Sequence, residues 1–246
     1  MTRSKHTFQV CFHDAHTLLI DKPPGMVVEN PSHSHEPSLK AAVQKQFPGA
    51  RPVHRIDKDT SGLVLWALSD EAYRYYSTLF QQRQVGKVYH AIVCGRISTG
   101  TQTIDLPLMR TASGKGRVSH RYGRPAQTTV EPIERFRRFS LVKCEPLTGR
   151  YHQIRIHLSS IGLPIAGDVL YGGCVPRLSE IKRNYKPKAH REEPPLIGRT
   201  ALHAYALRLV PYGRAEAMEW TAPYPKDFRS FLTKLRKYDQ WDAFSR

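Results

Sequence analysis

The stretch His54-Arg55-Ile56-Asp57-Lys58-Asp59-Thr60-Ser61-Gly62 is followed at once by the apolar run Leu63-Val64-Leu65-Trp66-Ala67-Leu68. That run has the length and the β-branched and aromatic content of a strand buried in a core. The polar stretch ends in Thr-Ser-Gly, which favours a turn. The sequence therefore predicts that Asp57 lies in a loop at the edge of a buried strand, where a rigid framework can hold a reactive carboxylate. On this stretch alone, a purely turn-forming role for Asp57 and Thr60 stays open.

Charge is the strongest signal in the composition. The chain has 246 residues, with 38 Lys and Arg against 21 Asp and Glu, a net charge of +17 and a pI of about 9.9. Such an excess favours a polyanionic partner, usually nucleic acid. A basic membrane-surface protein would need an amphipathic helix with an apolar face for lipid, and the sequence offers no good candidate. No run reaches the roughly 18 apolar residues of a membrane span, and the basic N-terminus lacks an apolar signal core. We therefore expect a cytoplasmic protein.

The cysteines and histidines give no metal-binding pattern. Cys11, Cys94, Cys144 and Cys174 are far apart in the sequence and form no CxxC pair. This spacing favours buried, reduced thiols over a zinc site or a disulfide framework. His33 and His35 lie in a Pro/Ser-rich stretch, where we expect them to be solvated. The sequence thus predicts a protein without bound metal.

The remaining pattern predicts one domain over residues 1–246, with many strands and few helices. Strands are expected at 10–12, 18–20, 63–68, 86–95, 128–130, 139–144 and 200–210. Helices are expected from Ser38, from Asp70 after an N-cap at Ser69, near Ile154 and from Pro225. Two basic insertions stand out, a loop at 174–198 and a long hairpin at 106–125. The hairpin's cations are uninterrupted by acidic residues and predict an arm that grips phosphates: Arg110, Lys115, Arg117, Arg121 and Arg124.

Two side chains keep alternative interpretations at this stage. Lys22 stands where Pro23-Pro24 ends a predicted strand. A solvated surface lysine and a contact to RNA or to an active site are about equally favoured there. Tyr89 lies in the strand Gly86–Gly95, where a core position with its hydroxyl at the edge is the simpler interpretation.

Three separated segments together resemble one family. The stretch 54–62 resembles the H-R-L-D-x-x-T-S-G signature of RluA-type pseudouridine synthases, with Ile56 in place of the commoner leucine. Lys87-Val88-Tyr89-His90-Ala91-Ile92-Val93-Cys94-Gly95 resembles that family's K-x-Y-x-A-x-V-x-G strand. Thr148-Gly149-Arg150-Tyr151-His152-Gln153-Ile154-Arg155 resembles its T-G-R-x-H-Q-[IL]-R segment. Weaker matches are 21–23, 167–172 and 202–204. No segment resembles the S4-like RNA-binding module that often precedes this catalytic domain, which moves target selection to the basic hairpin and loops.

The resemblance implies a fold and an activity. The fold is the α+β pseudouridine synthase fold, a mixed and mainly antiparallel sheet flanked by helices and basic loops. The activity is the isomerisation of uridine in tRNA or large-subunit rRNA to pseudouridine, by a monomer that needs no metal, nucleotide or redox cofactor. The C1′–N1 bond breaks, the uracil turns, and a C1′–C5 bond forms. Because the target base must leave its stack, a base-flipping enzyme is expected.

The same resemblance assigns roles to individual residues. Asp57 is the essential carboxylate, Arg155 pairs with it and keeps it ionised, and Tyr89 stacks on the base and serves in proton transfer. Arg55 fills the gap that the flipped nucleotide leaves. The other residues expected to contact substrate are Ile154, His54, Thr60, Arg150 and Lys22. Whether Asp57 attacks the ribose, attacks the base or removes a proton stays open.

Two other functions compete with this one. A glycosidase could use Asp57 and Asp59, but carboxylates at i and i+2 of an extended segment share a face, with Cα atoms roughly 6–7 Å apart. That spacing does not by itself place them on opposite sides of a sugar bond. Release of free base would identify such an enzyme. An inactive RNA-binding module is the other competitor, and the presence of Asp57, Tyr89 and Arg155 together argues against it. Turnover of uridine-containing RNA separates the two.

Overall fold

The chain forms two compact units, each built around a sheet. The structure is a computed structural model that describes residues 8–30, 36–185 and 192–241. Unit 1 comprises Met1–Val88 and His203–Tyr224, and unit 2 comprises Tyr89–Leu202 and Pro225–Arg246. Neither unit is a continuous segment, because the chain passes between them at 88/89, 202/203 and 224/225. The single domain expected over 1–246 stays a prediction.

The sheet of unit 1 has the order β1-β2-β4-β11, with β3 added to β4 and β12 to β11. Within the described residues of this unit, β4 and β11 pair in parallel and the other pairs are antiparallel. All seven residues of β4 are buried, which confirms the predicted core strand behind the Asp57 loop. The strands are β1 (Gln9–His13), β2 (Thr17–Lys22), β3 (Arg51–Pro52), β4 (Ser61–Ala67), β11 (Leu202–Leu209) and β12 (Met218–Thr221).

The described residues of unit 1 form two helices, and both begin as the sequence predicts. The Ser38 hydroxyl caps α1 (Leu39–Gln44) and the Ser69 hydroxyl caps α2 (Asp70–Gln81), by accepting backbone N–H groups at 3.3 and 3.2 Å. Helix α2 packs against β4 and buries Ala72, Tyr76 and Leu79, with Phe80 partly buried. Helix α1 ends at Gln44, four residues before Pro48.

The sheet of unit 2 has the order β5-β10-β9-β6, and these pairs are antiparallel. Its strands are β5 (Gly86–Cys94), whose first three residues belong to unit 1, β6 (Gln102–Asp105), β9 (Gln127–Arg135) and β10 (Phe139–Pro146). The predicted basic hairpin is present as β7 (Leu108–Arg110) and β8 (Gly116–Val118), which pair with each other. Sequence reasoning missed β6 because only Ile104 in it is buried, so no alternating pattern marks it.

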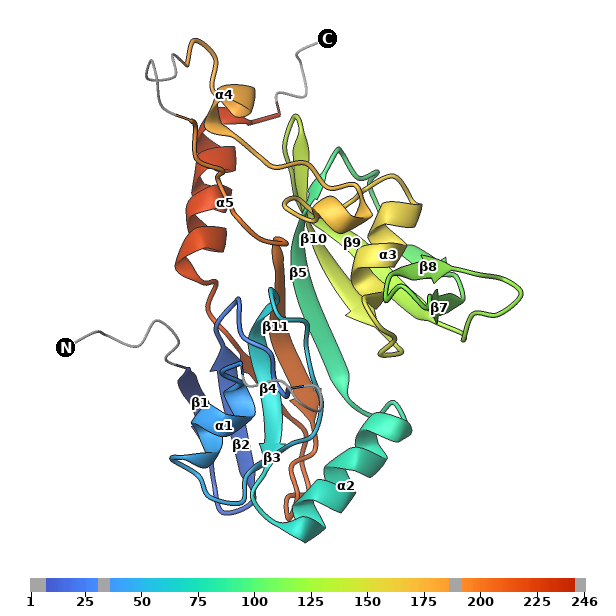
Figure 1. The fold of residues 1–246 in the computed structure, drawn as a ribbon, viewed down its shortest axis with the longest axis vertical. Coiled ribbons are helices and arrows are strands. Elements are labelled where there is room, and N and C mark those ends of the chain that lie inside the picture. The colour runs from blue at the N-terminus through green and yellow to red at the C-terminus, as the bar shows by residue number, and fades with distance from the viewer. Residues whose placement is uncertain (1–7, 31–35, 186–191, 242–246) are drawn as a thin grey trace, which may run out of the picture. The chain divides into compact units, whose positions relative to one another are not determined.

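Helices α3 (Gln153–Ser160), α4 (Leu178–Ile181) and α5 (Lys226–Tyr238) and the 3-10 turn η1 (Val169–Tyr171) complete unit 2 (Figure 1). Helix α5 begins after Pro225, as predicted, and buries Phe228, Phe231, Leu232 and Leu235. The prediction that 174–198 is wholly loop is wrong, because α4 forms there. The Glu180 carboxylate accepts the N–H of Arg177, and Ile181 is buried. Residues 186–191 of that stretch lie outside the described residues, as do His33 and His35.

Cysteine placement differs from the expectation of buried, separate thiols. Only Cys144 is buried, whereas Cys174 is exposed and Cys11 and Cys94 are partly exposed. The sulfur atoms of Cys94 and Cys174, which are 80 positions apart, lie 2.8 Å from each other in unit 2. The fold brings them together by placing the loop after η1 beside the end of β5, which sequence spacing cannot reveal.

Among the described residues, no helix combines the length and the apolar character that a membrane crossing requires.

The last residue of the Thr-Ser-Gly turn has to be glycine because β4 approaches β11 closely at this point. Gly62 has φ +110°, and a Cβ there would lie 2.2 Å from the carbonyl oxygen of Ala204. Backbone groups cannot give way as a flexible side chain can. The third residue of the turn therefore has to be glycine for packing as well as for backbone conformation.

We predict that Gly62→Ala destabilises the protein by more than about 2 kcal/mol, because a Cβ collides with backbone in addition to the cost of a strained φ. Gly213→Ala is the matched control, since Gly213 has φ +76° and a Cβ there would meet no other group within 4 Å. Chemical denaturation of both variants measures the difference. Equal losses at the two positions would show that conformational strain alone accounts for the effect.

Candidate active site

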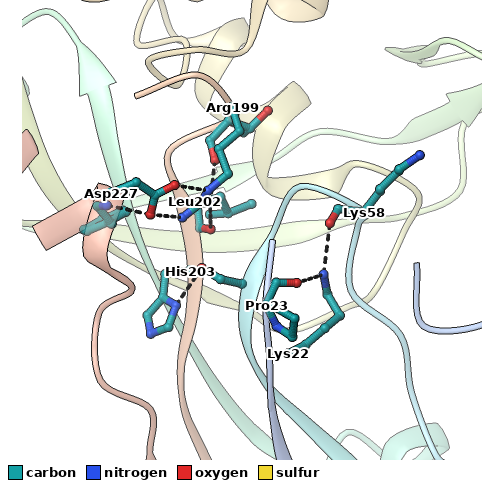
Figure 2. Close-up of polar contacts among 10 residues, drawn as sticks. Lys22, Pro23, Lys58, Arg199, Leu202, His203 and Asp227 are labelled. Carbon is teal, nitrogen blue, oxygen red and sulfur yellow. Dashed lines mark hydrogen bonds and ion pairs between the residues drawn. The ribbon is translucent and has the colours of Figure 1, made fainter. Parts of the chain in front are cut away.

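Lys22 anchors the loop that carries Asp57. It ends β2 and is 0% exposed. Its ammonium donates to the carbonyl oxygens of Pro23, Met26 and Lys58 at 2.9, 2.8 and 2.9 Å, two of which Figure 2 shows. The Lys58 carbonyl also accepts the N–H of Gly25 at 2.9 Å. The interpretation of Lys22 as a solvated surface lysine is therefore wrong, and its bonds hold the residue next to Asp57.

The Asp57 loop is a tight turn with a partly exposed carboxylate side chain. The N–H of Thr60 donates to the Asp57 carbonyl at 3.1 Å, and Thr60 is buried while Asp57 is half-buried. The backbone of Asp57 thus shapes the turn, as the simpler interpretation expected. That role uses the carbonyl group of Asp57.

Behind this loop, Ser61 and His203 connect β4 to β11. The Ser61 hydroxyl lies 2.9 Å from His203 Nδ1, and His203 Nε2 lies 3.1 Å from the Ala222 carbonyl oxygen. A carbonyl only accepts, so Nε2 carries the proton and Nδ1 accepts from Ser61. Both side chains are buried. Sequence reasoning gave His203 no role, and the weak match at 202–204 was the only signal for it.

His54 is a structural, neutral histidine rather than a free cation. Its Nε2 accepts the backbone N–H of Leu65 in β4 at 3.0 Å, and its ring stacks on Phe80 with centroids 4.8 Å apart. Burial, together with the nearby Lys87 ammonium, lowers the pKa of His54 to about 3. A ring that accepts a backbone bond at Nε2 has to be unprotonated there. The expected contact of His54 with substrate stays a prediction.

In unit 2, Arg155 forms a two-pronged ion pair with Asp168. Its Nε and one terminal nitrogen lie 2.6 and 2.8 Å from the two carboxylate oxygens, and Asp168 is 2% exposed. The sequence named Asp57 as the partner of Arg155 and missed Asp168, whose only signal was the weak match at 167–172. Guanidinium has five N–H donors, so the pair with Asp168 leaves capacity for another acceptor. Asp57 and Arg155 belong to different units, and their pairing stays a prediction.

Tyr171 joins three elements around this ion pair. The Arg155 guanidinium lies 5.0 Å from its ring centroid. Its hydroxyl accepts the N–H of Gly116 in β8 at 3.0 Å and lies 2.9 Å from Nδ1 of His152, the N-cap residue of α3. A Cβ on Gly116 would come within 2.4 Å of the Ile156 side chain, so the base of the hairpin packs closely on α3.

The cationic side chains of the hairpin point into solvent. All five are exposed, and in the part of the chain that the structure describes none of them forms an ion pair: Arg110, Lys115, Arg117, Arg121 and Arg124. The Arg110 guanidinium lies 4.6 Å from the Tyr151 ring centroid. Uncompensated cations on a docked hairpin suit a phosphate backbone, and this role stays a prediction.

The segment before α3 is partly structural. The buried Gln153 accepts from the Thr148 hydroxyl and from the Arg150 N–H at 2.7 and 2.9 Å, and it donates to the Gln127 carbonyl at 2.9 Å. Arg150 Nε donates to the Pro125 carbonyl at the end of the hairpin. Gln153 belongs to the segment that resembles T-G-R-x-H-Q-[IL]-R, but sequence reasoning gave it no role.

The predicted site residues are divided between the units. Unit 1 carries Lys22, His54, Arg55, Asp57 and Thr60; unit 2 carries Tyr89, Arg150, Ile154 and Arg155. Arg55 is exposed, Tyr89 is half-buried at the first position of unit 2, and Ile154 is buried. Among the described residues, no three His, Cys, Asp or Glu side chains form a group that could hold a metal ion.

The lowered pKa of His54 predicts acid sensitivity. Below pH 6.5 the unfolded chain protonates this histidine while the folded chain does not, so the free energy of unfolding falls as the pH drops from 6.5 toward 3. The contribution is at most about 1.4 kcal/mol per pH unit. We predict that His54→Gln flattens the pH dependence of stability between pH 6.5 and 4.5, measured by urea unfolding. His120→Gln, which changes an exposed histidine, is the control, and an equal slope in His54→Gln and the parent would contradict the prediction.

Comparison with known proteins identifies the family of this chain. A family model described as RNA pseudouridylate synthase matches residues 16–160. Ribosomal large subunit pseudouridine synthase D of Pseudomonas aeruginosa is 36% identical over 93% of this chain and 72% of that protein. A Bacillus subtilis protein, named uncharacterized RNA pseudouridine synthase YlyB, is 35% identical over 93% of this chain and 73% of its own length.

Solved structures show the same fold. The structure named human RNA pseudouridylate synthase domain containing 4 matches with a TM-score of 0.70 at 23% identity, over 92% of each chain. This likeness confirms the predicted α+β class with a mixed, mostly antiparallel sheet. With the matched family model and relatives above 30% identity, the chain belongs to the RNA pseudouridylate synthase family and is an isomerase of uridine in RNA.

Proposed function

We propose that this enzyme isomerises a uridine of large-subunit ribosomal RNA and that Asp57 is its essential carboxylate. The observation that carries the assignment of Asp57 is the buried Lys22 ammonium, which fixes the neighbouring Lys58 carbonyl and leaves the Asp57 side chain half-exposed. The ribosomal target is supported by the 36% identical relative, whose name gives that substrate. A cytoplasmic location and a monomer without metal or cofactor are part of the proposal.

The proposed chemistry is balanced without any other reactant. The C1′–N1 bond of the uridine breaks and a C1′–C5 bond forms, while a proton leaves C5 and N1 gains one. Attack by Asp57 at the ribose, attack at the base and removal of a proton all require an ionised carboxylate. Fixing the loop before substrate arrives places that carboxylate without further ordering, which is the main benefit of a preorganised site.

Tyr89, Arg155 and Arg55 are proposed to work on the same nucleotide. Tyr89 is half-buried at the start of its unit 2 segment, so one ring face can stack on a base while its hydroxyl moves a proton at C5. Arg155 is held by Asp168 and Tyr171 and supplies a positioned guanidinium. Arg55 is exposed, as a side chain that replaces a flipped base must be.

We predict that Asp57→Asn forms no detectable pseudouridine and still folds and binds RNA, because the change removes only the carboxylate charge. Asp59→Asn is the matched control and should keep its activity. In cells that lack the protein, the parent gene should restore pseudouridine in large-subunit ribosomal RNA and the Asp57→Asn gene should not, as measured by pseudouridine sequencing. Restoration only in transfer RNA would contradict the ribosomal target. Activity in Asp57→Asn, or release of free uracil by the parent, would contradict the chemistry.

We predict that Asp168→Asn and Arg155→Lys each lower the single-turnover rate far more than the RNA affinity, because each loosens the orientation of the guanidinium. The double variant should be little slower than the slower single variant, since both changes disturb one ion pair. Single-turnover rates and filter binding on the four proteins measure this cycle. Additive losses would mean that the two residues act separately, and lost affinity at normal rate would make Arg155 a phosphate contact.

A further inference from the structure

A second cationic surface lies in unit 2, away from the residues proposed for catalysis. A groove of about 810 Å³ runs between the turn that joins β9 to β10, the end of α5 and the residues just after it. It is lined by six basic side chains and one acidic one: Arg96, Arg135, Arg137, Arg183, Arg236 and Lys237, with Glu134. Arg183 belongs to the basic stretch 174–198, whereas the other lining residues lie outside the basic insertions and the family motifs, and none of the proposed catalytic residues lines the groove.

Most of this positive charge is not compensated within the protein. Glu134 accepts two-pronged hydrogen bonds from Arg236 at 2.9–3.1 Å, and the buried Asp239 lies 3.6 Å from Arg137. Among the described residues, the guanidinium groups of Arg96, Arg135 and Arg183 form neither a hydrogen bond nor an ion pair. Guanidinium groups that keep their N–H donors in this way match the oxygens of a phosphate.

An aromatic ring lies among these cations. The guanidinium groups of Arg96 and Arg135 lie 4.4 and 4.8 Å from the centroid of Trp241, which is half-buried. Stacking on the indole holds each guanidinium in place while its edge stays available to a ligand. Cations beside an aromatic ring are the combination that binds single-stranded nucleic acid.

Hydrogen bonds within the protein hold the walls of the groove together without a ligand. The Asp239 carboxylate accepts the N–H of Arg138 at 2.9 Å, and the Asp239 carbonyl accepts the N–H of Arg137 at 2.9 Å. A β-bridge joins Phe136 to Gln240. These backbone bonds attach the β9–β10 turn to the chain after α5, so the walls that carry Arg135 and Trp241 are fixed to each other.

The position of the groove indicates which part of an RNA it would meet. In the β5–β10 ladder, Tyr89 pairs with Cys144 at one end and Cys94 pairs with Phe139 at the other. Arg96 and Phe136 lie just beyond the Cys94 end, and five strand residues span about 17 Å. A ligand in the groove is therefore separated from a base at Tyr89 by several nucleotides.

We propose that this groove is a second RNA-binding site, which takes a single-stranded segment that flanks the target nucleotide. The inference rests on the proposed action on RNA and adds an affinity surface to it. A phosphate backbone matches the four basic side chains that form no ion pair among the described residues (Arg96, Arg135, Arg183 and Lys237), and a base matches the indole. An acidic protein segment would match the charge alone, since it has no base to stack on Trp241.

The test uses a ten-nucleotide oligouridylate as the probe, followed by fluorescence anisotropy at several salt concentrations. Arg96→Gln with Arg183→Gln should weaken binding at least fivefold at 0.1 M salt. It should lower the log–log salt slope by about 1.4, because each lost phosphate contact removes about 0.7 on a single strand. Arg74→Gln with Arg229→Gln removes two exposed arginines outside the groove and is the matched control. Equal losses in both double variants would overturn the proposal.

Tryptophan fluorescence gives an independent readout. Of the three tryptophans, Trp66 is fully buried and Trp241 is the one that lines the groove, so quenching that is lost with Trp241 reports on the groove. Unlabelled oligouridylate should quench the parent protein, and Trp241→Phe should abolish the quenching while thermal unfolding stays unchanged. Persistent quenching in Trp241→Phe, or equal quenching of the parent by polyglutamate, would overturn the proposal. Neither titration requires turnover, so failure here is distinct from failure of the Asp57 assignment.

Discussion

A single buried ammonium determines how unit 1 presents its reactive loop. Lys22 places a positive charge inside the protein, and three carbonyl oxygens from two separate segments compensate for its lost hydration. Removing water from an ion costs several kcal/mol unless the new partners are well placed. The turn after β2 and the residue after Asp57 therefore have to adopt one arrangement. Lys22 also pairs with Gly62 across the β2–β4 ladder, so the same residue connects the reactive loop to the buried strand.

Unit 2 uses the same principle with the charges reversed. The buried carboxylate of Asp168 fixes Arg155, and Tyr171 fixes the ion pair to α3 and to the hairpin. Arg199 and Asp227 form a further two-pronged pair at 2.7 and 3.0 Å, and Arg199 also donates to the Leu202 carbonyl (Figure 2). Each of these pairs joins segments far apart in the sequence. The net contribution of such pairs to stability can be small, because the cost of desolvating the charges offsets much of their attraction.

The local elements could be predicted from sequence, and the long-range polar contacts could not. Strand β4, the caps Ser38 and Ser69 and the buried face of α5 follow from patterns within a few residues. The resemblance named Asp57, Tyr89 and Arg155, whose roles remain to be tested. Asp168, His203 and Tyr171 were missed because their importance lies in partners 13 to 142 positions away. Lys22 shows the limit most clearly, since only the fold reveals that three carbonyls surround it.

In the basic hairpin, the residues that pack against the rest of unit 2 are different from the residues that are exposed to solvent. Its base is fixed to α3 through Gly116, Ile156 and Tyr171, while the side chains of Arg117 and Arg124 are exposed and form no ion pair in the described part of the chain. Substitutions at the base disturb this packing and lower the stability of the fold, whereas substitutions at the exposed positions hardly change it. Related enzymes can thus diverge in these side chains under selection for different RNAs. For an engineer, a library randomised at 117, 121 and 124 samples new surface chemistry on an intact scaffold.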